Sequence, residues 1–140
     1  MIQVVIDCAD PAGLAPFWAE ALGYVLQPPP PGFDSWEDFA EEIGIPPERR
    51  NDLAAVVDPD GDGPRLLFQR VPEAKTVKNR VHLDVPAAPE LEGERRWEAA
   101  LAHVRRLEAL GATRLGEHMG PAGERWIVLA DPEGNEFCVT

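Results

Sequence analysis

The chain has 140 residues, 44% of them hydrophobic, and carries 25 acidic against 13 basic side chains for a net charge of −12. This length predicts one ordinary domain, and no stretch approaches the roughly eighteen apolar residues that a membrane-spanning helix needs. Because lysine and arginine are scattered rather than striped, the sequence lacks the basic footprint of a protein that binds nucleic acid or acidic membranes. Without an N-terminal leader pattern the cytoplasm is favoured, where Cys8 and Cys138 would stay reduced.

The first segments predict a strand followed by a helix. Residues 2–10, IQVVIDCAD, alternate so that Ile2, Val4, Ile6 and Cys8 share one apolar face. Asp10 is predicted to cap a helix that begins at Pro11 and ends before Gly23. The apolar residues at helical spacing, which we expect to be buried, are Leu14, Phe17, Trp18, Ala21 and Leu22.

A proline-rich insert follows at residues 28–52. Within it SWEDFAEEI begins with a Ser-x-x-Asp capping pattern and predicts one short helix between loops. Two interpretations of its aromatic residues stay open, namely packing against the domain or a second subunit, and covering a binding site as a lid. The residues concerned are Phe33, Trp36 and Phe39.

Two segments predict β-hairpins, LAAVVDPDGDGPRLLFQ at 53–69 and WIVLADPEGNEFCV at 126–139. The second half also has an opening strand, RVHLDVPAA at 80–88, and a helix that ends in RRLEALGA at 105–112. On that helix we interpret His103 and the charged run at 92–98 as solvated surface. Each half therefore reads strand, helix, strand, strand, strand. We expect a single domain over 1–140, with module one at 1–72 and module two at 79–140.

Strand alternation also predicts a shared polar face. The residues expected to point away from the helices are Gln3, Gln69, His82, Asp84 and Cys138. If the two half-sheets curl around that face, these five side chains meet in one concave site. Trp126, if it faces inward with Val128, would lie in the wall of this site. His118, in the glycine-rich loop GEHMGPAGERW, either borders its mouth or has no role there.

The paired openings IDCADPAGLAPFWAEALG and VHLDV…LEALGA, with DPDGDGPRLLFQRVPE and LADPEGNEFCV, resemble the vicinal oxygen chelate superfamily. This superfamily includes glyoxalases, bleomycin-resistance proteins and extradiol dioxygenases, and the chain is most similar to its glyoxalase-like branch. The resemblance covers nearly the whole sequence. It implies an α+β fold of two βαβββ modules, a cup-shaped mixed sheet that binds small molecules, and a homodimer.

The resemblance further implies a divalent metal held by His or Glu at four positions, which fall on Gln3, Gln69, His82 and Cys138. Among these, His82 alone is a usual ligand type. Two neutral amides supply neither the basicity nor the compensating charge that Zn²⁺ or Fe²⁺ requires, so no cofactor is expected. A rebuilt metal site of His82, Cys138 and an acid, either Asp84 or Glu136, is the alternative.

Three functions stay open. The favoured one is a metal-independent protein that binds a compact apolar or ring-bearing ligand in the cup. The second is a lyase or isomerase in which His82, helped by Asp84, moves a proton next to a carbonyl; otherwise His82 is simply a hydrogen-bonded residue of the polar face. The third is a structural or partner-binding domain whose cup is filled by side chains. The candidate ligand contacts are Gln3, Gln69, His82, Cys138, Trp36, Phe39, Trp126 and His118.

Overall fold

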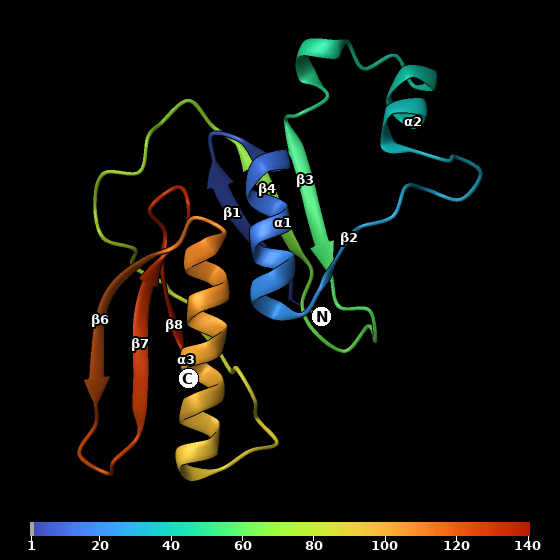
Figure 1. Cartoon of the computed structure of the whole chain (residues 1–140). Helices are drawn as coiled ribbons and strands as arrows, with labels where there is room; N and C mark the ends of the chain where they lie inside the picture. The colour runs from blue at the N-terminus through green and yellow to red at the C-terminus, as the bar shows by residue number, and fades with distance from the viewer. Residues whose placement is uncertain (1) are drawn as a thin grey trace. The chain divides into compact units, whose positions relative to one another are not determined.

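The structure is a computed structural model that describes residues 2–140 and divides the chain into two compact units, Met1–Ala74 and Lys75–Thr140. Each unit contains a four-stranded mixed sheet, with strands and helices in the order expected for a βαβββ module (Figure 1). The predicted fold class is confirmed, whereas the joining of the two sheets around a common cup stays a prediction. No helix within residues 2–140 is long and apolar enough to cross a membrane.

The sheet of the first unit has the order β1-β4-β3-β2, with β1 parallel to β4 and the other pairs antiparallel. The strands are β1 (Val4–Cys8), β2 (Val25–Leu26), β3 (Leu53–Val57) and β4 (Leu66–Arg70). Helix α1 (Pro11–Leu22) begins as predicted, because the Asp10 carboxylate accepts a hydrogen bond from the Gly13 N–H. It ends at Gly23, whose φ of 68° suits a residue without Cβ.

The insert contains α2 (Trp36–Glu42) and a 3-10 turn, η1 (Pro47–Arg49). The Ser35 hydroxyl accepts a hydrogen bond from the Asp38 N–H, which confirms the predicted cap. The ring of Phe39 meets those of Phe33 and Trp36 edge to face, with centroids 5.1 and 5.8 Å apart. The three aromatic side chains therefore pack on one another, and a role as a lid stays a prediction.

The sheet of the second unit has the order β5-β8-β7-β6. As in the first unit, the first strand in the sequence, here β5, is parallel to the last, β8, and the other pairs are antiparallel. Its elements are β5 (Asp84–Val85), α3 (Gly93–Ala109), β6 (Thr113–Met119), β7 (Arg125–Ala130) and β8 (Glu136–Val139). Both predicted hairpins are present, β3–β4 and β7–β8. Fully buried side chains from the strands and α3 form the core of this unit, namely Val85, Val104, Leu107, Ile127, Leu129, Phe137 and Val139.

Three expectations for the second half were wrong. The opening strand predicted at 80–88 is reduced to β5, and Val81 is 80% exposed because the chain bends before it reaches the ladder. His103, expected in solvent, is 6% exposed, and its Nδ1 lies 3.0 Å from an Arg106 nitrogen. His118 lies in β6 rather than in a loop.

The segment that leads to β5 is tied to the start of β8. The Glu136 carboxylate accepts hydrogen bonds from the Asn79 N–H at 2.9 Å and from Lys75 Nζ at 3.0 Å. The bond from Asn79, with help from Lys75, lowers the pKa of Glu136 to about 2. Because these bonds fix residues 75–79, they also set the path of the chain immediately before His82.

Glu136→Gln should destabilise the protein at neutral pH, by roughly 1–2 kcal/mol, because it removes a charged acceptor shared by two donors. The extra free energy of unfolding of the wild type should be fully present above the ordinary carboxyl pKa of 4.5 and should be lost as the pH falls towards 2. Urea unfolding across this pH range measures both effects. Glu98→Gln, at an exposed position on α3, is the matched control. Equal stability of Glu136→Gln and wild type at pH 7 would contradict the stabilising role of the Glu136 carboxylate.

Candidate binding site

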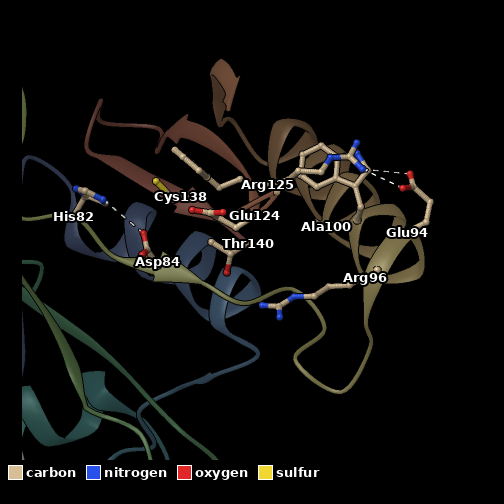
Figure 2. A pocket seen from close by; sticks show the side chains of 13 residues that line it. His82, Asp84, Glu94, Arg96, Ala100, Glu124, Arg125, Cys138 and Thr140 are labelled. Atoms are coloured by element: carbon tan, nitrogen blue, oxygen red, sulfur yellow. Dashed lines mark hydrogen bonds and ion pairs between the residues drawn. The ribbon is translucent and has the colours of Figure 1, made fainter. Parts of the chain in front are cut away.

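Three polar side chains of the second unit come together on one side of its sheet. Asp84 and Cys138 are direct partners in the parallel β5–β8 ladder, and His82 lies two residues before Asp84. His82 Nε2 is 3.6 Å from Asp84 Oδ1, and one ligand atom from each of the three residues lies within 4.8 Å of the other two (Figure 2). These three belong to the five polar residues that the sequence was expected to bring together, and a meeting with the other two, Gln3 and Gln69, stays a prediction.

The Cys138 thiol is a weak acid in this setting. Burial raises the pKa of Cys138 to about 11, with further contributions from the negative charge of Asp84 and from a hydrogen bond to its carboxylate. At neutral pH the sulfur therefore keeps its proton. Because the thiolate is the reactive form, the site disfavours nucleophilic catalysis by Cys138.

The same three residues provide the donor types for a metal ion but fit a resident metal poorly. A thiol ligand must lose its proton, and Asp84 opposes that loss. The side chains of His82 and Asp84 are also 49% and 65% exposed, so neither is held rigidly in a coordinating position. The divalent metal that the family resemblance implies therefore has no preformed donor set among His82, Asp84 and Cys138.

A pocket of about 830 Å³ opens beside this cluster. Its walls come from the first two turns of α3, from the loop before β7 with the start of that strand, and from β5 and β8 (Figure 2). All of the lining residues belong to the second unit: His82, Asp84, Gly93, Glu94, Arg96, Trp97, Ala100, Gly123, Glu124, Arg125, Trp126, Cys138 and Thr140. The polar cluster thus forms one end of a larger cavity.

Two indole rings line the pocket in different ways. Trp126 is paired with His118 across β6 and β7, and the two rings stack with centroids 5.6 Å apart. Trp97 lies under the Arg125 guanidinium, whose central carbon is 4.0 Å from the ring centroid. Arg125 also forms an ion pair with Glu94 at 3.1 Å. Both rings are therefore held in fixed orientations by neighbouring side chains.

Four of the candidate contact residues lie in the first unit, and they do not form one cluster there. Gln69 is opposite Asp7 in the β1–β4 ladder, four positions from Gln3, which is about 13 Å along a strand. Gln3 instead accepts a hydrogen bond from Arg65. Trp36 donates its indole N–H to the Gln27 carbonyl at 2.7 Å, and Phe39 packs on it. A ligand contact by these four residues stays a prediction.

Sequence reasoning missed most of the pocket wall on α3. Glu94 and Arg96 were assigned to solvated surface with the rest of the charged run at 92–98. The spacing of Gly93, Arg96, Trp97 and Ala100 does follow one helical stripe. That stripe could have predicted the pocket wall, because it places Arg96 on the same face of the helix as Trp97 and Ala100.

Two βαβββ units, one bearing a pocket beside its closing strand, define a class of small α+β proteins built on a repeated module. The family model for the Glyoxalase-like domain matches residues 3–140, and the chain belongs to this family. No curated protein matches the sequence.

Several solved structures share the fold. A glyoxalase/bleomycin resistance protein/dioxygenase family enzyme from Burkholderia phytofirmans PsJN is 18% identical, with 98% of this chain and 94% of that chain covered at a TM-score of 0.61. The fosfomycin resistance protein FosX from Listeria monocytogenes, complexed with Mn(II), is 13% identical, with coverages of 99% and 90% and a TM-score of 0.60. Lactoylglutathione lyase from Agrobacterium tumefaciens is 13% identical, with coverages of 99% and 90% and a TM-score of 0.56.

Asp84→Asn should increase the reactivity of Cys138 towards iodoacetamide. A thiol with a pKa of about 11 is ionised to roughly one part in a thousand at pH 8, and the loss of the Asp84 charge lowers that pKa. In a Cys8→Ser background we expect alkylation at pH 8 to become several-fold faster. Glu124→Gln removes the same charge from another pocket residue and should change the rate little. An unchanged or slower rate in Asp84→Asn would refute the assigned cause.

Proposed function

We propose that the protein binds a compact apolar or ring-bearing small molecule in the pocket of its second unit, without a metal. The observation that carries the proposal is the pocket, whose volume of about 830 Å³ lies within the usual range of ligand sites. Its two oriented indoles supply apolar contact surface, and His82, Asp84 and Cys138 supply hydrogen-bonding groups at one end. Such a division between apolar walls and a few polar groups is typical of small-molecule sites.

The chemistry of the polar end supports binding without covalent or metal chemistry. Cys138 is protonated, so it offers a weak hydrogen-bond donor rather than a nucleophile. Asp84 is 65% exposed and remains accessible to a ligand's hydroxyl or amine group. The homodimer and the cytoplasmic location expected from the sequence remain proposals beside this one.

Ligand binding should change the fluorescence of the pocket tryptophans. In a screen of hydrophobic ring compounds we expect saturable shifts at micromolar concentrations, on the order of −8 kcal/mol of binding free energy. Trp126→Phe should remove much of the signal, because this indole lines the pocket. Trp36→Phe is the comparator in the first unit. Loss of the signal in Trp36→Phe alone would place the ligand at the insert, and the absence of saturable binding throughout the screen would favour a structural or partner-binding role.

A second candidate function is proton transfer by His82 in a lyase or isomerase reaction. The favouring observation is that His82 is accessible and lies 3.6 Å from a carboxylate that can orient its ring. In that case His82→Ala would abolish turnover of a carbonyl substrate while leaving its affinity largely intact.

Metal analysis separates this candidate, in its metal-dependent form, from the leading proposal. Protein dialysed without chelator and analysed by plasma mass spectrometry should contain well under one Zn, Fe, Mn, Ni or Co per chain. The reason is the poor donor set, in which the thiol proton must be displaced against Asp84. Stoichiometric metal that disappears in His82→Ala would contradict metal independence and favour the enzyme.

A further inference from the structure

The pocket contains a positive charge that has no ion-pair partner in the described part of the chain. Arg96 lines the pocket and is half-buried, and among residues 2–140 its side chain forms no ion pair or hydrogen bond. The other guanidinium group in the pocket, that of Arg125, is already engaged by Glu94 and by the ring of Trp97. Arg96 is therefore the cation that remains available to a bound molecule.

Arg96 lies on the face of α3 that lines the pocket. Gly93, Arg96, Trp97 and Ala100 follow one another at helical spacing, and all of them line the pocket. Arg95, one residue earlier, is exposed and lies outside the lining. In Figure 2 the Arg96 side chain extends away from α3. Arginine at an inward position normally has a charged partner, because partial desolvation of an unpaired charge is unfavourable.

We propose that Arg96 binds an anionic oxygen group of the ligand, so that the pocket selects apolar or ring-bearing carboxylic acids over their neutral analogues. This inference rests on the proposed binding function and names the class of ligand. A guanidinium group donates two parallel hydrogen bonds to a carboxylate, which makes it a better partner for an acid than for an amide. The apolar part of the ligand contacts the indoles of Trp97 and Trp126.

The acidic residues of the pocket limit where the ligand's negative charge can lie. Asp84 lies at the polar end with His82 and Cys138, and Glu124 is another carboxylate of the lining. The third, Glu94, is already paired with Arg125. A second anionic group near Asp84 would be repelled, whereas a hydroxyl or amine would donate a hydrogen bond to it. The preferred ligand therefore carries one acid group, at Arg96, and a donor group at the Asp84 end.

Matched pairs of an acid and its primary amide test this preference. Naphthoic acid with naphthamide, and phenylacetic acid with phenylacetamide, differ in charge but little in shape. Titration calorimetry should show the acid of a pair binding at least tenfold more tightly than the amide to the wild type. In Arg96→Gln the preference should fall to less than about threefold, with the affinity for the amide unchanged. Arg95→Gln makes the same change in net charge on the same helix and should keep the wild-type preference.

The possible outcomes distinguish this inference from the proposed function. Equal binding of acid and amide to the wild type, or a preference that survives in Arg96→Gln, would overturn the inference and leave the binding function standing. If neither member of any pair binds, the binding function itself fails, and the inference fails with it. If Arg96→Gln does not fold, the salt dependence of binding to the wild type tests the inference instead. The affinity of the wild type for the acid should fall several-fold between about 50 and 500 mM NaCl while that for the amide stays constant, and a salt-independent acid affinity would overturn the inference.

Discussion

The parallel pairing of β5 with β8 determines where the polar groups of the pocket lie. It places residue 84 beside residue 138, although more than fifty positions separate them in the sequence. Hydrogen bonds between Leu83 and Cys138 and between Val85 and Thr140 hold the two strands together. Since His82 comes two residues before this pairing, its side chain emerges on the same side as Asp84. The cluster is thus a consequence of sheet topology rather than of any local motif.

Asp84 influences both of the other side chains in that cluster. Its carboxylate lies near the His82 ring, raises the pKa of the Cys138 thiol and faces the pocket. Burial and the Asp84 charge together keep Cys138 protonated, and the same carboxylate is an acceptor for a bound molecule. A metal ion would have to reverse the first effect to use the sulfur as a ligand. The fold does not determine whether a metal binds, because one scaffold can carry different side chains and hence different chemistries.

The repeated module and its turns could be predicted from the sequence because each depends on short-range chemistry. Proline and glycine define the two Asp-Pro-x-Gly turns, and Asp10 and Ser35 cap helices through their own side chains. The failures concern long-range packing. Val81 has the alternation of a strand residue, yet the chain meets its parallel partner only at β5. His103 and Arg96 belong to a charged helix surface by composition, and their burial depends on what the sheet places opposite them.

The two parallel ladders differ greatly in length, and this difference bears on local opening. Five residue pairs join β1 to β4, whereas two join β5 to β8. Backbone amides in short ladders at sheet edges exchange with solvent through small openings that leave the rest of the domain folded. The β5 edge, which carries Asp84, can therefore separate from β8 at a lower free-energy cost than the β1 edge can separate from β4. Opening of this two-residue ladder would displace Asp84 from the pocket lining, and a molecule bound there would favour the closed form.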